Sequence, residues 1–266
     1  MDSISLAKEI RKLSLKMVHN SNASHIGSAL SMTDFLAVLY TDVLKFDSSN
    51  PNFEKRDKLV LSKGHSCVAL YAVLGLKNFF DIGLLETYGK NGSDFMNHIS
   101  HKVPGVEFST GSLGHGLPYA VGIALGNKLK KINSKVYAIL GDGEVAEGSN
   151  WEALLFAAHN KLDNLIIIID NNNLQSLTTV DQTMSLEPYD DKFLSFGCNV
   201  VKVNGHDHVK LRDVFMNNNL PSKPLVVIAK TVKGKGVSFM ENQVKWHYKS
   251  PSSEELSIAI KEINNA

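Results

Sequence analysis

Hydrophobic and polar residues follow two different patterns along this chain, and segments with one pattern alternate with segments that have the other. Short apolar runs with the length of buried strands lie at 57–62, 135–140, 164–170, 199–204 and 224–231. Segments with helical spacing of apolar residues lie before and between them, at 4–19, 63–76, 147–162 and 206–218. Strands that alternate with helices predict a parallel sheet covered on both faces. We therefore predict a single α/β domain over residues 1–266, a doubly wound parallel sheet with helices on both faces.

Three further segments complete the predicted outline. The stretch 19–31 is mostly polar and is expected to be a loop, with a second helix starting near Ser31. A glycine-rich stretch, 109–131, leads into a helix of small residues that should pack closely, and 252–263 has the pattern of a C-terminal helix. No internal repeat or low-complexity linker divides the chain.

Composition and charge exclude several classes of function. The chain is 43% hydrophobic and 21% charged with a net charge of +1, so nothing suggests a nucleic-acid or anionic-membrane partner. No apolar run approaches the roughly 18 residues of a membrane span, and the N-terminus lacks the apolar stretch of a signal peptide. Cys67 and Cys198 form neither a metal motif nor a disulfide framework. We expect a soluble cytoplasmic protein with reduced thiols.

Distinctive polar motifs follow four of the predicted strands. They are SKGH (62–65), GDGE (141–144), DNNN (170–173) and TVKGKG (231–236). Ligands of open parallel sheets bind outside the carboxyl ends of the strands, which is where these motifs fall. In IIIIDNNN, an apolar run leads directly into one carboxylate and three amides. A plain turn could explain those residues, because Asn and Asp suit turns, but their place also fits a ligand site.

The GDGE and DNNN motifs together predict a site for a metal and a phosphate. Glycines beside Asp142 would let the backbone approach a ligand, and N–H groups beyond them can face a phosphate. Asn172 follows after a helix and a strand, a crossover that should place Asp142 and Asn172 on neighbouring strands. Magnesium prefers one or two protein oxygens combined with phosphate oxygens and water. A lone GDG is a weak signal, but the pair predicts the metal of a diphosphate.

These motifs resemble the thiamine diphosphate motif in the form found in transketolases. Other segments resemble the diphosphate-binding domain of that family, in the family's order: SHIGSALS (24–31), LSKGH (61–65), PGVEFSTGSLGHG (104–116), VNGHD (203–207) and KGKGVSFMENQVKWH (233–247). The resemblance covers essentially the whole chain. It implies the thiamine diphosphate-binding fold with thiamine diphosphate and Mg²⁺ as cofactors, Ca²⁺ and Mn²⁺ being the alternative metals.

The resemblance also implies a metal and diphosphate site. Asp142 and Asn172 match the family's metal ligands, with the carbonyl of Leu174 as the third protein oxygen. The N–H of Gly143 matches a diphosphate contact.

Further matches concern the organic part of the cofactor and the surroundings of the site. Gly111 and Leu113 match positions whose backbone meets the aminopyrimidine and lines the cofactor. Glu147 falls where the family has a carboxylate in a network that links the two cofactors of the assembly. His206 opens a helix, where we expect a local structural role.

Four of the ten histidines match family residues that line the substrate channel or contact the diphosphate: His25, His65, His98 and His247. We assign His65 and His247 to the diphosphate and to transition-state charge, and His25 to the donor and acceptor oxygens. Imidazoles change protonation near neutral pH, which suits proton transfers on sugar hydroxyls and a carbonyl oxygen. His101 lies in the same loop as His98 and is the alternative to it.

Four positions depart from the family pattern. Ser24 stands where the family commonly has Gly, and Ile26 where it often has Pro, on either side of the first histidine. Asn97 begins NHI where the family has GHP, and His115 replaces a common glutamine. The cofactor motif is intact, so these departures concern substrate preference.

The resemblance implies that another chain completes the site. In the family, a pyrimidine-binding domain later in the same chain supplies a glutamate to the aminopyrimidine ring. Here the sequence stops at Ala266, soon after the His247 segment. We therefore expect the pyrimidine-binding and C-terminal domains on a separate C-terminal subunit, in an α2β2 assembly. The chain alone should bind the cofactor weakly.

The implied function is transfer of a two-carbon ketol unit from a ketose phosphate to an aldose phosphate. The alternatives are a specialised thiamine-dependent ligase for an unusual sugar or a 2-oxo acid, and a non-catalytic cofactor-binding subunit. An ordinary nucleotide-binding α/β protein is disfavoured, because the chain has neither G-x-G-x-x-G after its first strand nor a Walker lysine motif. The sugars themselves are not predicted, because the family's sugar-phosphate contacts come mostly from the other half of the enzyme.

Overall fold

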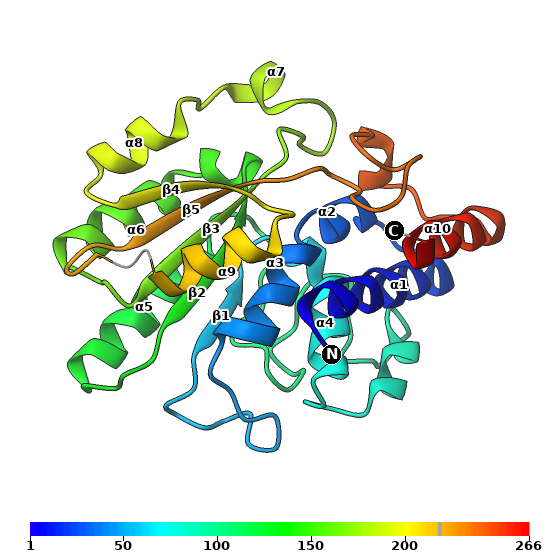
Figure 1. Ribbon diagram of the computed structural model, residues 1–266, viewed down its shortest axis with the longest axis horizontal. Coiled ribbons are helices and arrows are strands. Elements are labelled where there is room, and N and C mark those ends of the chain that lie inside the picture. The colour runs from blue at the N-terminus through cyan, green and yellow to red at the C-terminus, as the bar shows by residue number, and fades with distance from the viewer. Residues whose placement is uncertain (218–219, 266) are drawn as a thin grey trace.

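The computed structural model describes residues 1–217 and 220–265. Its centre is a sheet of parallel strands: β1 (Lys58–Leu61), β2 (Val136–Gly141), β3 (Leu165–Asn171), β4 (Asn199–Asn204) and β5 (Leu225–Lys230). The order in space is β1-β2-β3-β5-β4, and helices lie on both faces of the sheet (Figure 1). The predicted doubly wound parallel sheet is confirmed.

The run of isoleucines in β3 reflects the burial of both faces of the sheet. Successive side chains of a strand point to opposite faces. Ile166 and Ile168 accordingly pack in one hydrophobic core, and Ile167 and Ile169 pack in the other. A strand with helices above and below it needs apolar side chains in every position, so the run does not alternate with polar residues.

Helices from both ends of the chain cover the first face. They are α1 (Ser3–Ser21), α2 (Ile26–Ser31), α3 (Thr33–Val38), α4 (Cys67–Leu76), α9 (His208–Asn217) and α10 (Ser253–Asn265). Helices α1 and α10 lie side by side although they are the first and last of these elements (Figure 1). The predicted helix 206–218 corresponds to α9, and its residue 218 lies outside the described residues.

The second face is covered by α5 (Gly116–Leu129), α6 (Gly148–His159) and α8 (Tyr189–Ser195), while α7 (Val180–Met184) lies in the connection after β3. Short helical segments join the main elements: η1 (Leu39–Val43), η2 (Gly64–Ser66), η3 (Ile82–Thr87), η4 (Gly143–Ala146) and η5 (Val244–His247). None of the helices in residues 1–217 and 220–265 has the length and apolar character that crossing a membrane requires.

The prediction of a loop over 19–31 is wrong, because its second half forms α2. Ile26, Ala29 and Leu30 have the i, i+3, i+4 spacing of a helix face, and all three are fully buried. The segment is too short for that spacing to stand out from its polar neighbours. The predicted helix near Ser31 begins at Thr33 as the separate helix α3, and the predicted helix 63–76 begins with the single turn η2.

The strand register places the expected motifs at one edge of the sheet. Gly141, the last residue of β2, pairs with Asp170 of β3, so Asp142 and Asn172 follow neighbouring strands as predicted. Strands β1 and β5 flank this pair, with Leu61 opposite Ile139 and Lys230 opposite Asn171. All four motifs that follow strands therefore meet at the carboxyl edge.

Candidate active site

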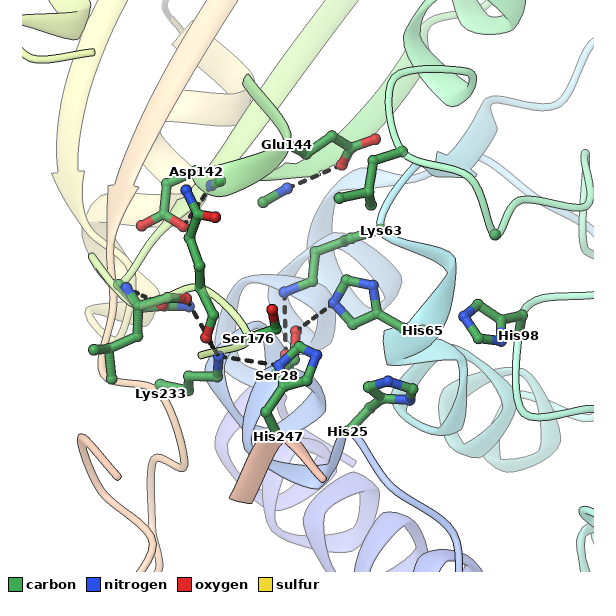
Figure 2. A pocket seen from close by; sticks show the side chains of 17 residues that line it. His25, Ser28, Lys63, His65, His98, Asp142, Glu144, Ser176, Lys233 and His247 are labelled. Atoms are coloured by element: carbon green, nitrogen blue, oxygen red, sulfur yellow. Dashed lines mark hydrogen bonds between the residues drawn. The ribbon is translucent and has the colours of Figure 1, made fainter. Parts of the chain in front are cut away.

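A cavity of about 240 Å³ opens at the carboxyl ends of β1, β2 and β3 (Figure 2). Every site residue expected from the sequence except Glu147 lines this cavity. It is also lined by several polar residues that the sequence did not single out, chiefly Ser28, Lys63, Glu144 and Lys233. Segments that are far apart in the sequence therefore build one polar site.

Four imidazole rings gather at one end of the cavity, and they come from four different segments (Figure 2). The ring centroid of His25 lies 5.2 Å from that of His65, 5.6 Å from that of His98 and 4.9 Å from that of His247. The centroids of His65 and His247 are 5.5 Å apart. His101 does not line the cavity; its ring and backbone bond to Ser109 instead.

Burial keeps these imidazoles neutral. It lowers the pKa of His25 to about 4, and repulsion from His98 when that ring is protonated, and from the ammonium of Lys233, adds to the effect. Burial, and then the charge of Lys233, lowers the pKa of His247 to about 3. Burial also moves the pKa of His65 well below its ordinary value, and that of His98 in the same direction. Neutral rings can both accept and donate protons at neutral pH.

Hydrogen bonds orient two of the rings. The ammonium of Lys233 lies 3.2 Å from Nδ1 of His247. An ammonium can only donate, so the proton of the neutral ring is on Nε2. Nε2 of His65 is 3.0 Å from the hydroxyl of Ser28, which fixes the plane of that ring.

The oxygens of Asp142, Asn172 and Leu174 lie at the other end of the cavity. Asp142 is 3% exposed, and its carboxylate accepts the N–H groups of Gly143 and Asn173. Asn172 donates its amide nitrogen to Ser31 at 3.0 Å, and its amide oxygen accepts the N–H of Leu174 at 3.1 Å. One carboxylate, one amide oxygen and one carbonyl are the kind of oxygen ligands that magnesium takes.

Two buried charges of opposite sign in this cavity lack an ionic partner among the described residues. Burial and the nearby Asp170 raise the pKa of Asp142 to about 6. Lys233 is 2% exposed and donates only to the carbonyls of Leu174 and Gln175 (3.2 and 2.8 Å) and to His247. Burial and Lys63 lower the pKa of Lys233 to about 8. A divalent cation bound to a diphosphate would neutralise both groups, so the residues present fit that pair.

Apart from Asp142, the ligands of the metal would be oxygens that do not belong to carboxylates. No three His, Cys, Asp or Glu side chains in the described part of the chain are arranged to hold a metal ion. Gly143, next to Asp142, packs closely against Gln175, because a Cβ there would lie 2.8 Å from the Gln175 side chain. Phosphate oxygens and water would therefore complete the coordination.

The four polar residues of DNNN have four different tasks. Asp170 is fully buried and forms an ion pair with Lys63, and it also accepts the hydroxyls of Ser31 and Thr231. Asn171 is buried at the end of β3, and Asn172 lines the cavity. Asn173 has φ of +62°, a left-handed conformation that Asn tolerates, and turns the chain. One motif thus supplies an internal counter-ion, a strand end, a ligand and a turn.

Lys63 and Glu144 were missed as functional candidates in the sequence. Lys63 is 1% exposed and also donates to the carbonyl of Ser28 at 3.2 Å. Glu144 is buried, and its carboxylate accepts the N–H groups of Gly114 (3.0 Å) and Gly141 (3.2 Å) and the hydroxyl of Ser62. The signal was their position within SKGH and GDGE, but only the folded chain shows their partners.

The remaining predicted residues lie around the glycine-rich loop. Gly111 faces His98, because a Cβ there would lie 3.6 Å from the ring, and Leu113 lines the cavity beside it. Glu147 is exposed, precedes α6 and contacts the loop, since a Cβ at Gly114 would lie 2.7 Å from the Cβ of Glu147.

Comparisons with known proteins agree with this geometry. Residues 3–263 match the family model described as transketolase, thiamine diphosphate binding domain. The chain is 40% identical over 255 residues to an apulose-4-phosphate transketolase subunit of Phocaeicola vulgatus, covering 96% of this chain and 91% of that protein. It is 38% identical over 259 residues to a 6-deoxy-6-sulfo-D-fructose transketolase subunit of Clostridium sp. (strain MSTE9), covering 97% and 94%.

A crystal structure shows the same fold within a longer chain. Transketolase from Campylobacter jejuni superposes with a TM-score of 0.94 at 32% identity, over 98% of this chain and 42% of that one. Both the sequence and the structural match extend over nearly all of the present chain. The chain therefore belongs to the transketolase family, and it has the fold of that family's thiamine diphosphate-binding domain.

Proposed function

We propose that this chain is the N-terminal subunit of a two-chain transketolase. The complete enzyme would use thiamine diphosphate and Mg²⁺ to transfer a two-carbon ketol unit from a ketose phosphate to an aldose phosphate. The observation that carries the proposal is one cavity that combines neutral imidazoles with a buried carboxylate, Asp142, and a buried ammonium, Lys233, neither of which has an ionic partner among the residues that the structure describes. The first group suits proton transfer, and the second suits a metal diphosphate.

Two groups of residues in that cavity would hold the metal and the diphosphate of the cofactor. Asp142, Asn172 and the carbonyl of Leu174 would bind the metal. Lys233, with the N–H of Gly143, would bind the diphosphate oxygens, since amide donors and a buried ammonium both favour an anion. Thiamine diphosphate, when bound, supplies a thiazolium carbon acid as the nucleophile, while the protein supplies orientation and electrostatics.

The imidazoles would handle the protons of the sugar. The neutral ring of His25 can accept a proton from a substrate hydroxyl and return it. His247 presents Nε2–H, because Lys233 occupies Nδ1, and so can donate to a developing oxyanion. His65 would contact the diphosphate, and the ring of His98 lies edge to face with that of His25. Glu147, outside the cavity, would serve the network between the two cofactors of the assembly.

A second chain would supply the pyrimidine-binding and C-terminal domains. The chain matches 42% of the Campylobacter jejuni transketolase chain but 91% of the Phocaeicola vulgatus protein, whose name describes that protein as one subunit of its enzyme. We propose that the single domain described here is completed by a separate subunit in an α2β2 assembly. We also propose a cytoplasmic location, where the buried free thiols of Cys67 and Cys198 would stay reduced.

A specialised sugar is the second candidate function, and two observations favour it. The relatives named above carry the names of unusual sugars, apulose 4-phosphate and 6-deoxy-6-sulfo-D-fructose. In addition, the hydroxyl of Ser24, one of the departures from the family pattern, lies 3.1 Å from Nδ1 of His25. That contact influences which nitrogen of His25 carries the proton, and so which substrate oxygen the ring can serve.

The proposal is tested by isolating the chain from its native lysate and identifying co-purifying proteins by mass spectrometry. A stoichiometric partner of about 300 residues is expected, the size of a two-domain chain. The two chains with thiamine diphosphate and Mg²⁺ should then transfer a ketol unit, and neither chain should do so alone. A panel of ordinary ketose phosphates, apulose 4-phosphate, 6-deoxy-6-sulfo-D-fructose and 2-oxo acids as donors would separate the two candidates. Failure of the reconstituted pair to bind thiamine diphosphate would instead favour a non-catalytic role.

A further inference from the structure

A second polar cluster lies outside the active-site cavity and is centred on Asp34 of α3. Asp34 is 6% exposed. Its carboxylate accepts two bonds from the guanidinium of Arg11, at 3.0 and 2.6 Å. Nδ1 of His206 lies 2.7 Å from one carboxylate oxygen, and Nε2 of His208 lies 3.2 Å from the other. Helix α1, helix α3 and the start of α9 therefore converge on one buried carboxylate.

His206 connects this carboxylate to the segment that follows β5. The backbone N–H of Val232 donates to Nε2 of His206 at 2.9 Å. Because that nitrogen accepts, the proton of the neutral ring must be on Nδ1, which donates to Asp34. His206 thus bridges Asp34 and Val232 in a single tautomer.

Arg11 connects the same carboxylate to the other end of that segment. Its Nε donates to the carbonyl of Lys235 at 3.0 Å, while its two terminal nitrogens bond to Asp34. Gly236 has φ of +92°, and a Cβ at this position would lie 3.1 Å from Nε of Arg11. The chain turns close against the guanidinium, where only glycine fits without strain.

Lys233 lies between these two attachment points. Its backbone belongs to the turn over 232–235, and its ammonium reaches Leu174, Gln175 and His247 in the active-site cavity. A lysine side chain has four rotatable bonds, so the place of its ammonium depends on where its backbone starts. A displacement of about 1 Å is enough to weaken a preorganised site substantially.

We propose that Arg11, Asp34 and His206 are positioning residues for Lys233. They hold the turn over 232–235 at both ends, and so fix where the Lys233 ammonium enters the cavity. His208 contacts the same carboxylate and Ser3, but not the turn. The identification of a diphosphate as the anion that Lys233 binds rests on the proposed function. The anchoring of the turn does not rest on it.

The test compares His206→Ala with His206→Gln and with His208→Ala. Glutamine retains one donor for Asp34 and one acceptor for Val232. His208→Ala removes a histidine from the same carboxylate without touching the turn. Amide hydrogen exchange at Val232, measured in the purified chain, reports directly on the hydrogen bond from the Val232 N–H to His206. We expect exchange about tenfold faster in His206→Ala, near the wild-type rate in His206→Gln, and little changed in His208→Ala.

The second readout is affinity for thiamine diphosphate with Mg²⁺ in the two-chain enzyme. We expect a Kd about tenfold higher for His206→Ala and recovery in His206→Gln. Equal effects of His206→Ala and His208→Ala on exchange or on affinity would overturn the inference, since both would then act only on fold stability. If the wild-type enzyme binds no thiamine diphosphate, the proposed function fails, and the exchange comparison alone supports or overturns the anchoring of the turn.

Discussion

The backbone N–H of His25 donates to the carbonyl of His247 at 2.7 Å, and their rings meet edge to face with centroids 4.9 Å apart. The first lies just before α2 and the second at the end of η5, near the other end of the chain. His25 has φ of +72°, an unusual conformation for a residue other than glycine. Its backbone is therefore fixed by the same segment that supplies the neighbouring imidazole, and a functional role would explain why the strain is kept.

Replacement of His25 should reduce catalysis more than cofactor binding. We expect His25→Asn to lower kcat/KM for ketol transfer by about 10²–10³-fold, because a proton-transfer group is lost. Asparagine tolerates the left-handed conformation, so the backbone should stay in place. The affinity for thiamine diphosphate should change little, because His25 is neither a proposed metal ligand nor a proposed diphosphate contact.

Steady-state kinetics of the two-chain enzyme provide the measurement for that prediction. His101→Asn is the matched control, because His101 is exposed and bonds to Ser109 outside the cavity. It should leave the rate unchanged. A His25→Asn enzyme with the wild-type rate would remove His25 from the proposed chemistry.

Removal of the metal ligand should abolish metal-dependent binding of the cofactor. Asp142→Asn keeps the size of the side chain but loses the negative charge that holds a divalent cation. We expect the Kd for thiamine diphosphate in Mg²⁺ to rise by about 100-fold, and wild-type protein treated with EDTA to behave similarly. Isothermal titration calorimetry, with and without Mg²⁺, would measure both effects.

Asp191→Asn is the control for this experiment. Asp191 is an exposed carboxylate in the first turn of α8, away from the cavity. The control should bind as the wild type does. If Asp142→Asn retained the full dependence on Mg²⁺, the metal would have to bind elsewhere.

The neutral state of His25 makes stability depend on pH. Its pKa falls from 6.5 to about 4 on folding, chiefly through burial, so between those values the unfolded chain binds more protons than the folded one. The contribution of the neutral His25 ring to the free energy of unfolding should therefore be fully present above about pH 6.5, and it should decline as pH falls toward 4. His25→Asn should show a smaller decline over the same range.

Urea denaturation at pH 7 and pH 5 would measure this difference. The relevant quantity is the change in unfolding free energy between the two pH values, compared between wild type and His25→Asn. His101→Asn should decline as steeply as wild type. Identical declines in wild type and His25→Asn would mean that the ring is not held neutral by the fold.

The ion pair of Lys63 and Asp170 should matter for stability far more than a surface pair. Lys63→Met leaves the Asp170 carboxylate buried without its cation, which typically costs about 3–5 kcal/mol. The exposed pair of Lys130 and Glu54 is the comparison, and Lys130→Met should cost no more than about 1 kcal/mol. Chemical denaturation of both variants at pH 7 would measure the difference. Equal losses would show that water reaches the Lys63 pair.

Much of the fold follows from local patterns. The apolar run of β3 and the helix–strand alternation predicted the parallel sheet, and the crossover between Asp142 and Asn172 predicted their adjacency. Helix α2 was missed, because its six residues are too few for a clear period and its burial comes from contacts with distant elements. The same limit applied to α7 and α8, which are five and seven residues long.

The sequence by itself determined which residue types follow each strand, and therefore which edge of the sheet carries the site. It also carried the motifs that identify the family. Only the tertiary structure decided that His98 rather than His101 lines the cavity, and that Asp170 pairs with Lys63 while Asp142 has no cationic partner among the described residues. The physical reason is that strand and helix patterns depend on near neighbours in the chain, whereas burial and charge pairing depend on segments that meet only after folding.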